Sequence, residues 1–241
     1  MTFPLLQQLQ ESVNDRSTLK AIFVAGIPAA GKSYTVSQIS DGAIPLCIVN
    51  TDNVIEFFHR KGLIDMRNKS EQRSVLDQAK KTTKEQLFHW LNGTLPLIID
   101  STSSNEQNII RRKGLLQSLG YDVAMVWVNV DVETAVARAA KRDRAVDEAF
   151  IRRSYEVAEE NKEYFRGNFN NFVEVDNAGG AIDASTLAKA VKAASSFLGA
   201  EVGNPTGKRL KKNMAEKQLK YLVPGVYDEQ QLRSLVESWY K

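Results

Sequence analysis

Short runs of apolar residues alternate along the chain with longer segments whose apolar positions recur every three or four residues. The short runs are typical of buried parallel strands and the longer segments of helices, so the pattern predicts βαβ units. We expect strands over 19–25, 44–50, 95–100, 121–130 and 171–177. We expect helices over 32–40, 71–91, 105–119, 132–142, 146–165 and 184–198. A further helix is expected to begin after residue 50, with Thr51 or Asp52 as its N-cap. The alternation predicts an α/β fold with a five-stranded parallel sheet.

The character of the chain changes from Gly199 onward. The stretch GAEVGNPTG (199–207) is typical of a linker, and a short helix is expected over 228–240. Between them, 208–220 holds six basic residues against one acid, Glu216. We therefore expect a main domain over 1–200 and a small, helical, basic C-terminal extension over 201–241.

Composition excludes several classes of site. The chain has 241 residues, a net charge of +3, two histidines and a single cysteine, Cys47. One cysteine allows no intrachain disulfide and no Cys/His zinc site, and we expect no disulfide-linked partner. The amino end lacks the pattern of a signal peptide, and no apolar run approaches the length of a membrane span. We expect no membrane association and a cytoplasmic location.

The stretch AGIPAAGKSY (25–34) places Gly26, Gly31, Lys32 and Ser33 in the spacing G-x-x-x-x-G-K-[ST], between an expected strand and an expected helix. Such a turn exposes backbone N–H groups to phosphates, and the helix N-terminus adds a favourable dipole. The lysine bridges phosphate oxygens, and the serine offers a hydroxyl to Mg²⁺. We expect a nucleotide to contact the whole loop, namely Gly26, Ile27, Pro28, Ala29, Ala30, Gly31, Lys32, Ser33 and Tyr34.

Acidic residues follow two further strands. In NTD (50–52), Asp52 faces the crevice where ligands of parallel sheets bind, and it could accept the proton of an attacking hydroxyl. In IIDSTSSN, Asp100 could hold the water shell of Mg²⁺. Either carboxylate could instead cap the helix that follows it. The neighbouring hydroxyls are candidates for substrate contacts: Thr51, Thr102 and Ser103.

A basic turn occurs in VARAAKRDRAV (136–146). Arg138 and Arg142 share a helical face, and Arg144 follows in the turn. Placed over a nucleotide, Arg138 and Arg142 could neutralise charge on a transferring phosphoryl group, with Arg144 nearer the substrate. The alternative is a solvated helix end with favourable dipole placement.

The order of these motifs resembles that of P-loop kinases of the polynucleotide-kinase and zeta-toxin type. The resemblance rests on GIPAAGKS, VNTDN, LIIDSTSSN and VDVETAVARAAKRDRAVDEAFIRRSYE, and covers roughly residues 19 to 177. It implies a P-loop NTPase three-layer sandwich with an adenylate-kinase-like sheet, using ATP and Mg²⁺. It also implies a catalytic base at Asp52, phosphate binding at Lys32 and Ser33, and lid arginines at Arg138 and Arg142.

The acceptor of the phosphoryl group stays open. The leading hypothesis is a hydroxyl of DNA or RNA, either a 5′ end or a hydroxymethylated base as in a related virus-encoded group that modifies DNA, with the basic segment 208–220 holding the polymer. Polynucleotide kinases usually place a basic residue and a second acid around the catalytic aspartate, whereas Thr51 and Asn53 stand here. A zeta-toxin-like kinase of a nucleotide-sugar or other small molecule is the second hypothesis. A nucleotide-dependent ATPase or switch protein is the third.

Overall fold

The computed structural model describes residues 15–41, 44–65, 68–102, 105–141, 146–178, 182–218 and 226–240. The strands are β1 (Lys20–Gly26), β2 (Cys47–Val49), β3 (Leu97–Thr102), β4 (Asp122–Asn129) and β5 (Phe172–Asp176). The helices are α2 (Lys32–Ser40), α3 (Thr51–Arg60), α4 (Lys69–Asn92), α5 (Glu106–Ser118), α6 (Val132–Ala140), α7 (Glu148–Asn168), α8 (Ala184–Gly199), α9 (Pro205–Gln218) and α10 (Glu229–Trp239). The elements follow the order that the hydrophobic pattern predicted.

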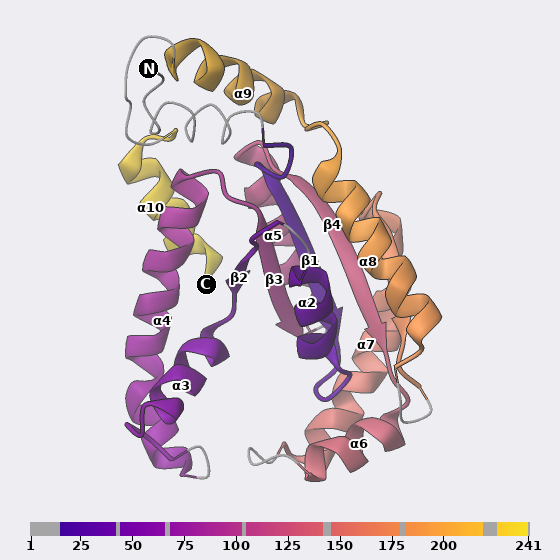
Figure 1. Cartoon of the computed structure of the whole chain (residues 1–241). Helices are drawn as coiled ribbons and strands as arrows, with labels where there is room; N and C mark the ends of the chain where they lie inside the picture. The colour runs from indigo at the N-terminus through magenta and orange to yellow at the C-terminus, as the bar shows by residue number, and fades with distance from the viewer. Residues whose placement is uncertain are drawn as a thin grey trace.

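The five strands form one parallel sheet in the order β2-β3-β1-β4-β5, which confirms the predicted α/β fold. β1 lies at the centre and every one of its residues is buried. Helices α2 and α8 lie on one side of the sheet and α5 on the other (Figure 1). Because β3 lies between β1 and β2, the carboxyl ends of these three strands meet at one edge of the sheet.

The edge strand β2 is shorter than the pattern predicted. The apolar run covers 44–50, but ladder pairing with β3 extends only over Cys47–Val49. Pro45 has no N–H to donate to a ladder, so pairing begins after it. The backbone N–H of Cys47 donates to the Pro96 carbonyl at 2.9 Å, which fixes the start of the strand.

One continuous hydrophobic core includes both layers and the carboxyl end of the chain. Phe23 of β1 meets Phe169 edge-to-face with ring centroids 5.5 Å apart, and Trp127 of β4 packs on Phe165 of α7. The α10 side chains of the same core are Leu232, Val236 and Trp239. A second, smaller cluster joins α3 and α4 through Ile55, Ile64 and Ala79.

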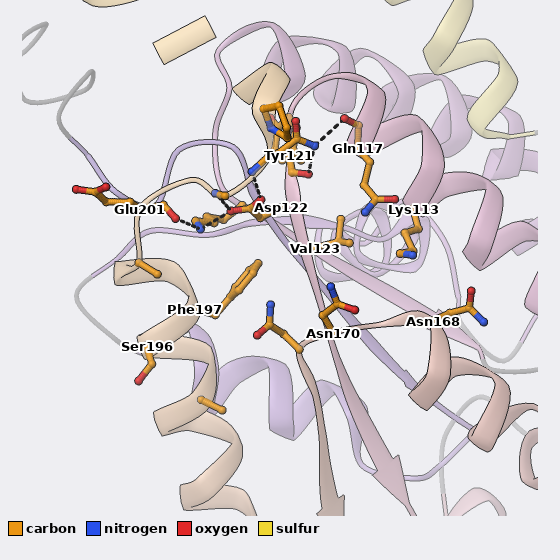
Figure 2. Close-up of a pocket in the computed structure, with 17 residues that line it drawn as sticks. Lys113, Gln117, Tyr121, Asp122, Val123, Asn168, Asn170, Ser196, Phe197 and Glu201 are labelled. Atoms are coloured by element: carbon orange, nitrogen blue, oxygen red, sulfur yellow. Dashed lines mark hydrogen bonds and ion pairs between the residues drawn. The ribbon is translucent and has the colours of Figure 1, made fainter. Parts of the chain in front are cut away.

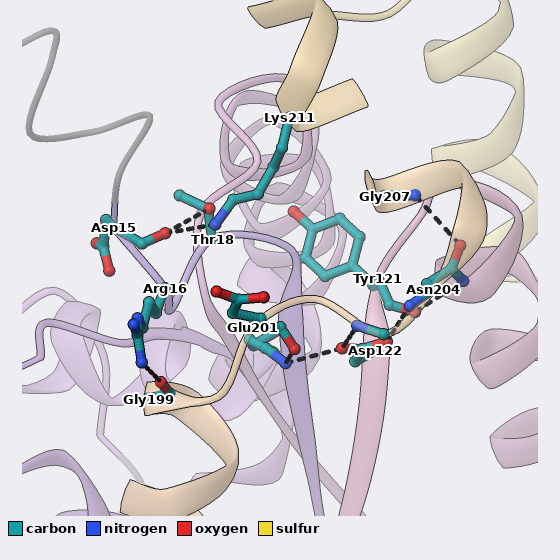
Figure 3. Close-up of polar contacts among 12 residues, drawn as sticks. Asp15, Arg16, Thr18, Tyr121, Asp122, Gly199, Glu201, Asn204, Gly207 and Lys211 are labelled. Atoms are coloured by element: carbon teal, nitrogen blue, oxygen red, sulfur yellow. Dashed lines mark hydrogen bonds and ion pairs between the residues drawn. The ribbon is translucent and has the colours of Figure 1, made fainter. Parts of the chain in front are cut away.

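The segment 199–207, predicted as a linker, is packed against the amino ends of the strands. The buried Lys20 ammonium forms an ion pair with Asp122 at 2.7 Å and donates to the Glu201 carbonyl. The Asp122 carboxylate also accepts the backbone N–H groups of Gly203 and Asn204 (Figure 3). The two strand starts thus anchor the segment, and α9 begins within it at Pro205. The division into domains at residue 200 stays a prediction.

Candidate functional site

In the turn between β1 and α2, other parts of the chain approach two of the glycines closely. A Cβ at Gly26 would lie 2.6 Å from the Val128 carbonyl oxygen. Gly31 has φ +97°, and a Cβ there would overlap the Asn177 side-chain amide. Ala29 also adopts a positive φ of 62°, which costs a non-glycine residue about 1–2 kcal/mol. A loop held in this form presents successive N–H groups to an anion.

Lys32 lies across this loop. Its ammonium donates to the carbonyl oxygens of Gly26 and Ile27, both at 3.0 Å. The positive charge is thereby held at the opening of the turn. A phosphate group bound there could replace the two loop carbonyls as the acceptor of the ammonium hydrogen bonds. Ser33 and Tyr34 follow on the first turn of α2, and both side chains are exposed. The arrangement suits the phosphates of a nucleotide.

The predicted cap of α3 was wrong by one or two residues, and the difference bears on Asp52. The helix cap is Asn50, whose Oδ1 accepts the Asp52 backbone N–H at 2.8 Å. The strand stops at Val49, so the first polar residue after it takes the cap position. Capping is therefore done by the Asn50 amide rather than by the carboxylate of Asp52, whose side chain is exposed at the cavity described below.

Asn50 also connects the two predicted acidic residues. Its Nδ2 donates to the Asp100 carboxylate at 2.8 Å, while its Oδ1 holds the backbone of Asp52. Asp100 lies on β3 opposite Val24 of β1, two residues before the P-loop glycine Gly26. No function was predicted for Asn50; its signal in the sequence was its position as the first polar residue after a buried strand.

A cavity of about 340 Å³ opens where these strand ends meet α3, α4, α5 and α10. Asp52 and Asp100 both line it, together with Asn50 and Thr51. The remaining lining residues are Val49, Thr83, Ile99, Asn105, Asn108, Ile109, Arg112, Trp239 and Tyr240. Because β3 adjoins β1, one of the strand ends that line this cavity neighbours the strand end that carries the P-loop, although no P-loop residue lines the cavity itself. Asp52, predicted as the base, Asp100, predicted as a metal ligand, and Thr51 thus line one cavity.

Arg138 reaches the P-loop through a residue that the sequence analysis did not identify. Its Nη2 donates to Asn177 Oδ1 at 2.9 Å, and Asn177 Nδ2 donates to the Ala30 carbonyl at 2.5 Å. Asn177 follows β5 and is only 3% exposed. Arg138 Nη1 is buried and has no hydrogen-bond partner among the described residues. A guanidinium with an unused donor beside the P-loop suits an additional phosphate oxygen.

Four of the predicted substrate and lid residues cannot be placed as side chains. Arg142, Arg144 and Ser103 lie outside the described residues. Thr102 ends β3 opposite Gly26, but only its backbone is described. Their proposed contacts stay predictions.

A second cavity, larger than the first, contains none of the predicted site residues. It measures about 690 Å³ and lies at the amino ends of β1 and β4, between α5, α7 and α8 (Figure 2). Lys113 lines it with its ammonium 5.3 Å from the Phe169 ring, and burial lowers the pKa of this lysine. In sheets of this kind ligands bind at the carboxyl ends of the strands, so the smaller cavity is the candidate site.

The basic segment also lies at this far end. α9 contacts the turn before β4, where Gly207 packs on Gly120, and Lys211 donates to the Asp15 carbonyl at 2.7 Å. The basic side chains Lys208, Arg209 and Lys212 are exposed. Figure 1 shows α9 across the end of the sheet opposite the turn between β1 and α2. Its predicted binding of DNA or RNA stays a prediction.

Comparison with known proteins gives a family and a fold. The family model described as "Zeta toxin" matches residues 5–194. No curated protein sequence matches the chain. Among the helices of the described residues, none has both the length and the apolar character needed to cross a bilayer.

Three solved structures share the fold. A candidate kinase from Chloroflexus aurantiacus is 18% identical, with a TM-score of 0.52, over 75% of this chain and 98% of its own. The PezAT chromosomal toxin–antitoxin system of Streptococcus pneumoniae is 15% identical, with a TM-score of 0.51, over 96% of this chain and 93% of that one. The AvrRxo1-ORF1:-ORF2 complex is 13% identical, with a TM-score of 0.53, over 97% of this chain and 86% of that one.

Proposed function

Because this chain belongs to the zeta toxin family of P-loop kinases, we propose that it transfers the γ-phosphoryl group of ATP to a hydroxyl of a small molecule. The observation that carries the proposal is the link through Asn50, which joins Asp52 and Asp100 in one cavity at the carboxyl ends of β2 and β3. Phosphoryl transfer to an alcohol uses a phosphate-binding loop and a carboxylate that accepts the proton of the hydroxyl, and here both follow strands of one sheet at its carboxyl edge.

The P-loop binds the nucleotide in this proposal. Lys32 leaves the carbonyls of Gly26 and Ile27 and moves to the β- and γ-phosphates, where the N–H groups of the loop also point. Arg138 adds a donor through Nη1, held in place by Asn177. Exposed residues Ser33 and Tyr34 complete the contacts at the start of α2.

Mg²⁺ would be held by oxygen ligands from the start of α2 and from β3, and oxygen atoms are the ligands it prefers. Ser33 offers a hydroxyl and Asp100 a carboxylate, one oxygen of which already accepts from Asn50. A bound Mg²⁺ supplies neutralisation of charge on the β- and γ-phosphates. The Asn50 hydrogen bond holds the Asp100 carboxylate in one orientation for this task.

Asp52 acts as the base. Its carboxylate takes the proton of the acceptor hydroxyl as that oxygen forms a bond to the γ-phosphorus and the bond from phosphorus to the bridging oxygen of ADP breaks. Because Asn50 caps α3, the Asp52 carboxylate is not needed as the helix cap and can accept the proton instead. Thr51 lines the same cavity and positions the acceptor.

The position of α9 favours a small acceptor over a nucleic acid. The exposed basic side chains lie at the amino ends of the strands, whereas the transfer site lies at their carboxyl ends. A polymer held by α9 would have to pass along the molecule to reach Asp52. Transfer to a DNA or RNA hydroxyl is therefore an outcome of the test and not the proposal. ATP hydrolysis without transfer is a further outcome of the same test.

The test is labelling with radioactive ATP against small hydroxyl compounds, nucleotide-sugars, 5′-hydroxyl oligonucleotides and hydroxymethyl-base DNA. We expect transfer to a small compound. Asp52→Asn should reduce transfer by roughly 10²–10⁴-fold while nucleotide affinity is retained, because only proton removal is affected. Lys32→Ala should lose both nucleotide affinity and transfer to every acceptor.

Glu56→Gln is the matched control, since Glu56 is an exposed acid on the same helix and does not line the cavity. It should leave transfer unchanged. Full turnover in Asp52→Asn contradicts the assignment of the base. Hydrolysis of ATP with no labelled acceptor supports the ATPase alternative instead.

A further inference from the structure

The carboxyl end of the chain returns to the candidate site. α10 packs on α4 and α5, and the last described residues, Trp239 and Tyr240, line the same cavity as Asp52. Figure 1 shows the C-terminus beside α4 and β2, far from α9. The two helices of the predicted extension thus lie in different places, and one of them forms a wall of the cavity.

This wall is held by several polar contacts. Arg111 and Arg112 of α5 donate to the final carbonyls of α10, those of Ser238 and Trp239. Such contacts satisfy helix C-terminal carbonyls and complement the helix dipole. Lys84 of α4 forms an ion pair with Glu237 at 2.7 Å. The position of Trp239 and Tyr240 is therefore fixed relative to α4 and α5.

Arg112 is the single basic residue among those that line the cavity. Its Nε donates to the Trp239 carbonyl at 3.2 Å, and its guanidinium lies over the Trp239 ring at 5.2 Å. No carboxylate of the described residues lies within ion-pair distance of it. Burial lowers the pKa of Arg112, so its charge is partly removed from water, and the two carboxylates of the cavity, Asp52 and Asp100, lie at the strand ends and form no ion pair with it. Such a guanidinium favours an anion in the cavity.

Two of the other lining residues, Asp52 and Asp100, are acids at the strand ends, and the remaining polar groups of the cavity are neutral. Asn105 and Asn108 of the α5 start, Thr83 of α4 and the hydroxyl of Tyr240 can donate or accept hydrogen bonds. The Tyr240 hydroxyl is buried and hydrogen-bonds to none of the described residues. A volume of about 340 Å³ lies at the small end of ligand pockets, which suits a sugar-sized compound rather than a polymer end.

We infer that the acceptor is a small polyhydroxy compound that carries an anionic group, either a carboxylate or a phosphate. Arg112 binds this group, Asp52 receives the proton of a hydroxyl, and Trp239 and Tyr240 of α10 close the pocket around the carbon skeleton. The inference rests on the proposed kinase activity and adds to it the charge of the acceptor and the function of the C-terminal helix.

The experiment compares matched acceptors with the full chain. Transfer from labelled ATP is measured for glucose, glucuronate and glucose 1-phosphate, within a wider set of neutral sugars, sugar acids, sugar phosphates and 5′-hydroxyl oligonucleotides. We expect the acids or the phosphates to exceed the neutral compounds in kcat/KM, and the two anionic arms identify which group Arg112 takes. Arg112→Gln should raise KM for the anionic acceptor by about 10- to 100-fold. Arg112→Lys should recover part of this loss.

Arg111→Gln is the matched control. Arg111 also donates to the end of α10 but does not line the cavity, so its loss affects the wall without removing the cavity charge. It should leave the preference for anions unchanged. Nucleotide affinity, measured by fluorescence titration, should be the same in all three variants.

Outcomes of three kinds contradict the inference, and they differ in what they leave of the proposed function. Equal transfer to neutral and anionic compounds, or equal KM changes in Arg111→Gln and Arg112→Gln, overturns the inference and leaves the kinase proposal in place. Labelling of no hydroxyl compound at all overturns both. Preferential labelling of an oligonucleotide overturns the small-acceptor assignment.

Discussion

Arg138 and Asn177 form a hydrogen bond of 2.9 Å that ties α6 to the residue after β5. Asn177 is at the same time bonded to the P-loop through the Ala30 carbonyl. One buried amide therefore sets both the position of the arginine and the form of the loop. Arg138 and Asn177 are 39 positions apart in sequence, and the local pattern around neither residue shows this contact.

Asn177→Ala should lower both stability and nucleotide affinity. The change leaves the Ala30 carbonyl and a second guanidinium nitrogen without partners, which costs about 1–3 kcal/mol of unfolding free energy. Urea unfolding and fluorescent-nucleotide titration measure the two effects. Asn170→Ala is the control, because Asn170 is exposed and lies far from the loop. If Asn177→Ala keeps its nucleotide affinity, the Asn177 amide has only a structural function.

Gly31→Ala should abolish nucleotide binding in a folded protein. A Cβ at this position meets the Asn177 amide, and φ of +97° is unfavourable for alanine. Gly114→Ala is a paired variant within α5, where an added Cβ meets nothing within 4 Å. It should raise the unfolding free energy by roughly 0.5–1 kcal/mol, because alanine favours a helix over glycine. Circular dichroism and titration distinguish the two variants, and normal binding by Gly31→Ala would contradict the described loop.

The buried pair Lys20–Asp122 should respond unequally to loss of each partner. Asp122→Ala leaves the Lys20 ammonium, at 2% side-chain exposure, with only the Glu201 carbonyl and the Phe197 ring. Removing one partner of a buried ion pair costs about 3–5 kcal/mol. Lys20→Met costs less, because Gly203 and Asn204 still donate to the carboxylate. Chemical unfolding measures both, and equal losses would refute the asymmetry.

Acid should remove the stabilising contribution of Glu174. Desolvation acts to raise the pKa of this carboxyl, but hydrogen bonds from Lys162 and Asn129 and the charges of Lys162 and Arg166 outweigh it, so the folded pKa lies below the usual value. The contribution is complete above the unfolded pKa of about 4.3 and is lost as pH falls through the lower folded value. Unfolding free energy against pH should be flatter below pH ~5 in Glu174→Gln. Identical acid profiles would show that another carboxyl dominates.

Two tyrosines near the carboxyl end provide a matched test of hydroxyl satisfaction. Tyr227 donates to the Leu119 carbonyl at 2.6 Å, whereas the Tyr240 hydroxyl has no partner among the described residues. Tyr227→Phe should cost about 1 kcal/mol, and Tyr240→Phe should change stability by less than about 0.5 kcal/mol. Burial raises the pKa of Tyr240 to about 12, so the hydroxyl is neutral at the pH of the measurement. Equal costs in urea unfolding would mean that Tyr240 has a partner after all.

Local sequence features were sufficient for the strands and the P-loop. Strand runs such as 19–25 and 121–130 are apolar apart from Lys20, Asp122 and Asn129 near their ends, which is typical of a parallel sheet covered on both faces. The P-loop could be found because its phosphate-binding groups are mostly backbone N–H groups of consecutive residues. The β2 boundary was less accurate because pairing depends on which N–H groups face the neighbouring strand.

Capping and long-range contacts could not be read from the pattern with the same accuracy. Asn50, Thr51 and Asp52 are all good capping residues, and the point where β2 leaves its neighbour selects Asn50. Asn177 is one polar residue after a strand, and its importance depends on where α6 and the P-loop lie. Basic residues in 208–220 indicated a charged surface but not the end of the sheet that carries it.

By itself the sequence determined the α/β class, the phosphate-binding turn and the order of the acidic and basic residues along the chain, because each depends on neighbours within a few positions. The tertiary structure decided that Asn50 joins Asp52 to Asp100, that Asn177 joins Arg138 to the P-loop, and that α10 forms a wall of the cavity with Arg112. These contacts depend on which strand ends and helix faces meet in space, and a linear pattern does not specify that meeting.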